Sequence, residues 1–137
     1  MFFALPRIFL ILRRLIAAAK QRRPKVALLL DLPDFNLPLA KALKRQGIPV
    51  VYYISPQVWA WRKKRVQYIK RWVDRMLVIL PFEKDFYDSH GVPVDFVGHP
   101  LTEEVDLGLS RHEARVQLGL DRDQTVVALL PGSRTKE

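Results

Sequence analysis

Short apolar runs alternate with amphipathic runs along this chain, and that alternation constrains the fold more than any other feature of the sequence. Five apolar runs have the length and composition of strands: Lys25–Leu30, Val50–Ile54, Met76–Leu80, Val94–Val97 and Thr125–Leu130. Segments with helical periodicity lie between them. Strands that are apolar throughout and alternate with helices are typical of a parallel sheet. The sequence therefore predicts the α/β class, with a Rossmann-like parallel sheet and helices on both of its faces.

Capping residues set the expected boundaries of the helices. Asn36 is expected to cap a helix over Leu37–Gln46, after a loop that begins at Asp31. A basic helix is expected over about 60–72, and a further helix over 81–89 that opens at a proline. Ser110 and Glu113 have the spacing of a capping box, which predicts a helix that runs through residue 118.

The first 19 residues are apolar and are interrupted by three arginines. Ile8, Leu12, Leu15 and Ala19 recur at helical spacing, and the basic residues fall on the opposite side. The uninterrupted apolar stretches are too short to span a bilayer, and no small-residue cleavage site follows them. The segment is therefore expected to form an amphipathic helix. Two readings stay open at this point: a helix that packs on the core, and a helix that lies on a membrane surface.

Composition and charge limit the kind of protein that this chain can be and the kind of partner that it can bind. Apolar residues make up 49% of the chain and charged residues 27%, which excludes a disordered tail and a protein that crosses the membrane repeatedly. The formal net charge of +9 predicts an anionic partner: nucleic acid, a phospholipid surface or a phosphorylated substrate. The chain has no cysteine, and its His, Asp and Glu residues do not cluster at metal-ligand spacing. We expect neither a bound metal nor another cofactor.

Distinctive polar clusters follow each predicted strand, at the edge of a parallel sheet where ligands usually bind. Asp31 comes directly after the first strand, and a carboxylate in that place is a candidate general base for an acceptor hydroxyl. Asp34 and Asn36 lie in the loop that follows. They are candidates for substrate binding, with helix capping as the structural alternative. His99 follows the fourth strand and has the same two readings, as a residue of the site or as a hydrogen-bonded structural histidine.

An indole-rich segment follows the second strand. Ser55 begins it, and Trp59 and Trp61 are two residues apart, which cannot share one helix face. In a loop, both indoles can line a pocket for a sugar or an acyl chain, and the alternative is ordinary packing. The last strand leads into Gly132, Ser133 and Arg134, where backbone N–H groups and a guanidinium suit a nucleotide diphosphate. No Gly-Lys-Ser/Thr sequence follows, so this segment is not a P-loop.

Five sequence strings, in order and at matching spacing, carry a resemblance to a known family. They are DLPDFN at Asp31–Asn36, YISPQVWAWR at Tyr53–Arg62, LPFE at Leu80–Glu83, FVGHPL at Phe96–Leu101 and LLPGSR at Leu129–Arg134. Together they resemble lipid-A-disaccharide synthase, a glycosyltransferase of lipopolysaccharide assembly. The resemblance extends over nearly the whole chain.

The resemblance implies an incomplete half of a B-type two-domain glycosyltransferase fold. Residues 1–122 then form an acceptor-side Rossmann-like domain, and residues 123–137 begin a domain that binds the UDP-sugar. The implied reaction transfers diacylglucosamine from UDP-diacylglucosamine to diacylglucosamine 1-phosphate with inversion, giving lipid A disaccharide 1-phosphate and UDP. Asp31 falls on the family's candidate base, and Arg134 on its functionally important arginine. The family is peripheral to the cytoplasmic face of the inner membrane, and nucleic acid is not an expected partner.

Two departures from the family pattern lead to a further expectation. The opening strand with its G-E-x-S-G-D loop does not precede Met1, and most of the nucleotide-binding domain does not follow Glu137. We therefore expect the 137-residue chain alone to be inactive as a transferase. Two other functions remain open: another two-Rossmann UDP-sugar transferase or epimerase, and a basic module that binds membrane or nucleic acid.

Overall fold

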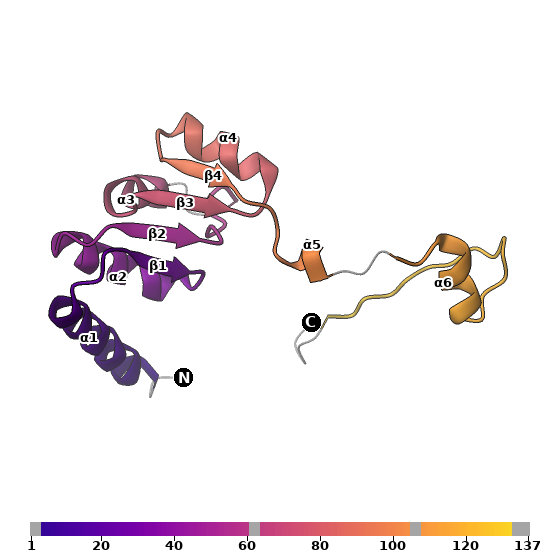
Figure 1. The fold of residues 1–137 in the computed structure, drawn as a ribbon, viewed down its shortest axis with the longest axis horizontal. Coiled ribbons are helices and arrows are strands. Elements are labelled where there is room, and N and C mark those ends of the chain that lie inside the picture. The colour runs from indigo at the N-terminus through magenta and orange to yellow at the C-terminus, as the bar shows by residue number, and fades with distance from the viewer. Residues whose placement is uncertain (1–3, 61–63, 105–107, 133–137) are drawn as a thin grey trace. The chain divides into compact units, whose positions relative to one another are not determined.

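The computed structural model describes residues 4–60, 64–104 and 108–132 (Figure 1). The chain divides into two compact units, residues 1–102 and 103–137, which are described separately. The predicted domain boundary at residue 122 stays a prediction.

A four-stranded parallel sheet forms the centre of the first unit. Its strands are β1 (Ala27–Leu30), β2 (Val50–Tyr53), β3 (Arg75–Val78) and β4 (Val94–Phe96), and they lie in the order β1-β2-β3-β4. Each neighbouring pair is parallel. The first four predicted strands and the parallel α/β architecture are confirmed.

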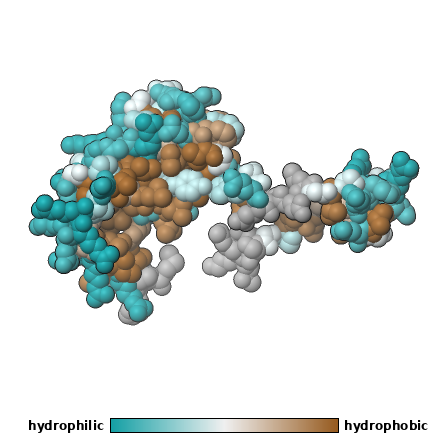
Figure 2. All heavy atoms as spheres, in the orientation of Figure 1, coloured by the Kyte–Doolittle hydropathy of each residue, from teal (hydrophilic) through white to brown (hydrophobic). Residues whose placement is uncertain are grey.

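Helices connect the successive strands: α2 (Pro33–Arg45), α3 (Arg65–Trp72) and α4 (Pro81–Ser89). Strands in sequential order, joined by crossovers of one hand, place all connecting helices on the same face of the sheet. Burial follows this arrangement, because Val50, Tyr52 and Met76 on that face are fully buried while Leu28 and Leu30 on the other face are 63% and 52% exposed. Figure 2 shows hydrophobic residues gathered over the strands. In the described part of the chain, helices therefore cover one face of the sheet, whereas the sequence predicts helices on both faces.

The amphipathic helix expected near the N-terminus is present as α1 (Ala4–Arg22). Leu12, Ile16 and Ala19 pack against the core, and α1 contacts α2. Ile8, Ile11 and Leu15 recur at three- and four-residue spacing beside that stripe and are 44–49% exposed. Both readings of the helix thus have support in the structure. Among the described residues, no helix has the length and apolar character needed to cross a bilayer.

Two helix starts differ from the prediction. The helix α2 begins at Pro33 rather than Leu37, so Asn36 lies inside the helix and does not cap it. The reason is the sharp left-handed turn at Asp31 and Leu32, which brings Pro33 into the first helical turn. The helix α3 begins at Arg65 instead of residue 60, and residues 61–63 lie outside the described part.

The second unit contains α6 (Arg111–Gln117), and the short α5 (Leu101–Glu104) was not predicted. The capping box is confirmed: Ser110 Oγ accepts a hydrogen bond from Glu113 N at 3.3 Å, and Glu113 Oε2 accepts one from Ser110 N at 2.7 Å. The predicted strand over residues 125–130 is wrong, because these residues pair with no strand within the described residues. Leu129 and Leu130 are 87% and 89% exposed, and an apolar run becomes a strand only beside a partner.

Candidate active site

The carboxyl ends of the four strands meet at one edge of the sheet, and backbone hydrogen bonds continue past the strand ends. Asp31 N donates to Tyr53 O at 3.1 Å, and Ile54 N donates to Leu77 O at 3.1 Å. Val97 N donates to Val78 O at 3.0 Å. The segments that follow the strands are therefore aligned side by side, as the sequence predicted.

Three residues other than glycine have left-handed backbone angles at this edge. The φ angles are +47° at Asp31, +43° at Leu32 and +62° at Ile54. Such angles cost L-residues on the order of 1–3 kcal/mol and persist only where the surrounding structure holds them. Strain of this kind concentrates at functional sites. Its presence after both β1 and β2 supports the choice of this edge as the candidate active site.

Two buried side chains hold the strained turn in place. Asn36 Nδ2 donates to Leu30 O at 2.9 Å and to Asp31 O at 2.8 Å. The Tyr52 hydroxyl donates to Asp31 O at 2.5 Å. Burial, with a further contribution from the negative charge of Asp31, raises the pKa of Tyr52 well above its usual value of 10.0. The hydroxyl therefore stays protonated and remains a donor.

The Asp31 carboxylate, in contrast, is not used by the fold. The residue is exposed, and within the described residues no hydrogen bond or ion pair involves its side chain. Three hydrogen bonds hold its backbone N–H and C=O groups, while its carboxylate faces solvent. A fixed, unengaged carboxylate at a strand end is what a general base for a bound hydroxyl requires.

Asp34 lies one helical turn further on and has a different environment. Its side chain is 81% exposed, and its Oδ1 accepts a hydrogen bond from Arg65 Nη2 at 2.6 Å. This ion pair joins the first turns of α2 and α3. The two residues border a pocket of about 420 Å³ whose apolar lining includes Leu37 and Tyr68. The predicted substrate contacts of Asp34 and Asn36 stay predictions.

Beyond β2, Ser55 and Trp59 each form a hydrogen bond with a buried residue of α4. Ser55 is buried, and its Oγ lies 2.8 Å from the Tyr87 hydroxyl and donates to Pro56 O. Burial raises the pKa of Tyr87 to about 12, although the Ser55 hydrogen bond acts in the opposite direction. Trp59 Nε1 donates to Glu83 Oε1 at 3.3 Å, and Glu83 is only 2% exposed. These contacts give Ser55 and Trp59 a structural role, and their predicted substrate contacts stay predictions.

The Trp59 ring also packs against Phe82, with ring centroids 5.0 Å apart in an edge-to-face arrangement. Phe82 is 49% exposed, so this pair of aromatic rings reaches the surface at the same edge of the sheet. Trp61 lies outside the described residues. His99 is half-buried, and its Nδ1 accepts a hydrogen bond from Leu101 N at 3.2 Å, which favours a structural role for this nitrogen.

The predicted diphosphate segment belongs to the second unit. Gly132 is exposed and has a φ of +85°, whereas Ser133 and Arg134 lie outside the described residues. Its contact with a diphosphate stays a prediction.

Three residues that support the site carry no role predicted from the sequence: Tyr52, Glu83 and Tyr87. Each looked like a core or helix residue in its own segment. A signal was available only for Glu83, the third residue of α4: its Oε2 accepts a hydrogen bond from Leu80 N at 3.2 Å, as acidic residues in a first helical turn often do. In the described part of the chain, no group of three or more His, Cys, Asp or Glu side chains is arranged to hold a metal ion.

Comparison with known proteins connects this geometry to one family. The family model described as lipid-A-disaccharide synthetase matches residues 1–137. Proteins named lipid-A-disaccharide synthase from Myxococcus xanthus (strain DK1622) and Anaeromyxobacter dehalogenans (strain 2CP-C) are 55% and 56% identical to the chain over 133 residues. The protein of the same name from Koribacter versatilis (strain Ellin345) is 51% identical over 133 residues.

Each of these matches covers 97% of this chain but only 34–35% of the relative. The chain thus spans about a third of the length of the curated relatives it matches. The resemblance seen in the five sequence strings is confirmed, and the chain belongs to the lipid-A-disaccharide synthetase family.

Proposed function

We propose that this chain forms the acceptor-side part of a lipid-A-disaccharide synthase. The reaction joins the acceptor hydroxyl of diacylglucosamine 1-phosphate to the anomeric carbon of UDP-diacylglucosamine. The new bond to the acceptor oxygen forms as the bond to the UDP oxygen breaks, and the configuration inverts. The products are lipid A disaccharide 1-phosphate and UDP.

Asp31 is the base that takes the proton of the acceptor hydroxyl. The observation that carries this role is the unengaged carboxylate on a strained turn that Asn36 and Tyr52 hold rigid. Rigid placement of a base lowers the barrier because no further ordering is needed in the transition state. Trp59 and the pocket beside Asp34 border the same edge and suit the sugar and an acyl chain.

The diphosphate of the donor is bound by Gly132, Ser133 and Arg134, whose residue types suit a nucleotide diphosphate. The protein lies on the cytoplasmic face of the inner membrane as a peripheral protein. The exposed apolar stripe of α1 and the net charge of +9 support contact with an anionic membrane surface.

A chimera tests the transferase role. The matching 133-residue region of the Myxococcus xanthus relative is replaced by the corresponding part of this chain, and UDP release is measured with both lipid substrates. We expect the chimera to transfer diacylglucosamine, and Asp31→Asn to lower its turnover by about a hundred- to ten-thousand-fold.

Asp85→Asn is the matched control, because Asp85 is an exposed aspartate on α4 away from the strand ends. It should keep normal turnover. Near-normal turnover of the Asp31→Asn chimera would remove the base role, and a chimera without any transfer would contradict the proposed function itself.

A further inference from the structure

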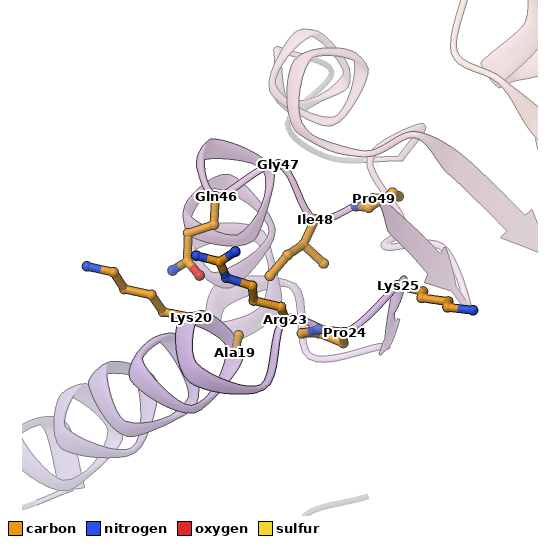
Figure 3. A pocket seen from close by; sticks show the side chains of 9 residues that line it. All are labelled: Ala19, Lys20, Arg23, Pro24, Lys25, Gln46, Gly47, Ile48 and Pro49. Carbon is orange, nitrogen blue, oxygen red and sulfur yellow. The ribbon is translucent and has the colours of Figure 1, made fainter.

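A pocket of about 600 Å³ lies where α1 and α2 end (Figure 3). Ala19 and Lys20 of the last turn of α1, with residues 23–25 that lead into β1, form one side of it, and residues 46–49, between α2 and β2, form the other. Both segments lead into the amino ends of their strands. Asp31 follows the opposite end of β1, a strand of four residues that spans about 13 Å. The pocket is therefore separate from the candidate active site.

The pocket is positively charged. Lys20, Arg23 and Lys25 line it, and no acidic residue does. Within the described residues, none of these three cations forms an ion pair. The C-termini of α1 and α2 each contribute roughly half a negative charge, so together they offset only about one of the three positive charges. The remaining charge favours an anionic ligand.

Arg23 has a backbone conformation that usually belongs to glycine. Its φ angle is +45°, and its N–H donates to Ala19 O at 2.9 Å, closing the end of α1. Glycine is the favoured residue at a left-handed helix end because it has no Cβ. Figure 3 shows the guanidinium of Arg23 directed toward the carboxamide of Gln46, between the two segments. The strained backbone thus places this guanidinium over the pocket.

Gln46 contributes an unsatisfied acceptor. Its Nε2 donates to Ile16 O at 3.3 Å, which orients the carboxamide. Its Oε1 is buried, and no donor in the described part of the chain reaches it. A buried carbonyl oxygen without a partner is costly, so a rotation of the carboxamide that brings this oxygen to the pocket and into a hydrogen bond with a ligand hydroxyl is favourable.

We propose that this pocket binds a phosphate ester that carries a hydroxyl group near the phosphate. The guanidinium of Arg23 binds two phosphate oxygens, and the ammonium groups of Lys20 and Lys25 neutralise its charge. The carboxamide of Gln46 rotates toward the ligand, and the ligand hydroxyl donates to its Oε1. A glycerol phosphate has this chemistry, either as a free molecule or as the headgroup of a phospholipid. The proposal does not depend on the transferase role.

The first experiment titrates the isotope-labelled 137-residue chain with sn-glycerol 3-phosphate, inorganic phosphate and sulfate, and follows the backbone amides by NMR. Gly47 lines the pocket, and Gly98 lies at the opposite edge of the sheet as an internal reference. Saturable shifts are expected at Gly47 and not at Gly98. Sulfate has no proton to donate to Gln46 and should bind more weakly than the glycerol phosphate.

Arg23→Gly separates a binding role from a structural one. Glycine suits the left-handed conformation, so the variant should unfold at a temperature no lower than the parent, yet bind the ligand about tenfold more weakly or worse. The control is Arg22→Gln, which removes the neighbouring charge outside the pocket and should leave binding nearly unchanged.

A second arm distinguishes the sources of the phosphate. Vesicles of phosphatidylcholine with and without phosphatidylglycerol are mixed with the parent and both variants. Binding of the free glycerol phosphate identifies a soluble ligand. Binding only to vesicles with phosphatidylglycerol, weaker in Arg23→Gly than in the parent and unchanged in Arg22→Gln, identifies a lipid headgroup. Equal binding by the two variants, whether reduced or retained, or no binding to any of these probes, would overturn the proposal.

Discussion

Asn36 shows how one side chain can determine the shape of the candidate site. Its amide nitrogen donates to two carbonyl oxygens of the strained turn, and the residue is 7% exposed. The carboxylate of Asp31 can act as a base only if this turn stays in place. A carboxylate at position 36 would replace a donor with an acceptor and bring a negative charge close to two carbonyl oxygens.

We therefore expect Asn36→Asp to lower the free energy of unfolding by about 2 kcal/mol, measured by urea denaturation at neutral pH. In the chimera it should also lower turnover. Gln67→Glu is the matched control, since it makes the same amide-to-acid change at an exposed position of α3 and should shift stability by less than about 0.5 kcal/mol. Equal effects of the two changes would mean that the contacts of Asn36 do not hold the turn.

The same residue marks the limit of prediction at this scale. The sequence placed Asp31 at a strand tip correctly, because an apolar run followed by an acidic residue and a proline is a local signal. It placed Asn36 at a helix cap, because asparagine favours that position. Its real partners are carbonyl oxygens five and six residues earlier, which depend on two left-handed residues that no local propensity indicates.

At the scale of the element, α1 has two apolar stripes with different partners. Leu12 and Ile16 pack against the core, whereas Ile11 and Leu15 remain exposed. An exposed apolar stripe beside basic residues is typical of a helix that lies on a membrane surface. Substitutions in the two stripes should therefore affect different properties.

We expect the double change Ile11→Gln and Leu15→Gln to weaken binding to phosphatidylglycerol vesicles about tenfold or more, because less apolar area is transferred into the membrane. Thermal stability should hardly change, because both positions are exposed. Val116→Gln with Leu118→Gln is the control, since it removes two exposed apolar side chains from the second unit. Vesicle binding is measured by co-sedimentation. If both double variants lose vesicle binding equally, the exposed stripe of α1 has no special part in membrane binding.

Elements were more predictable than their boundaries. Four strands were predicted from continuous apolar runs, because this pattern lies within each segment and does not depend on the elements that pack beside it. The run over residues 125–130 has the same local signal but forms no strand, because a strand also requires a neighbour with which to pair. Coverage of the sheet depends on the order of the strands, which local pattern does not contain.

At the scale of the whole molecule, two fully buried tyrosines couple the fold to alkaline pH. Burial raises the pKa of Tyr52 well above 10.0 and the pKa of Tyr87 to about 12, while both ionise near 10.0 in the unfolded chain. Below pH 10 the two tyrosines are protonated in both the folded and the unfolded chain, so they do not make the free energy of unfolding depend on pH. Above pH 10 the unfolded chain loses protons that the folded chain keeps, so stability falls as the pH rises.

Each such tyrosine should lower the free energy of unfolding by about 1.4 kcal/mol per pH unit between pH 10 and pH 12. The slope is measured by urea denaturation across this range, with tyrosinate absorbance recorded in parallel. Tyr52→Phe should remove about half of the slope that the two tyrosines cause. It should also cost about 1 kcal/mol at neutral pH, because the hydrogen bond to Asp31 O is lost. An unchanged slope in this variant would mean that Tyr52 ionises before the sheet unfolds, and that the strained turn beside Asp31 opens independently of the core.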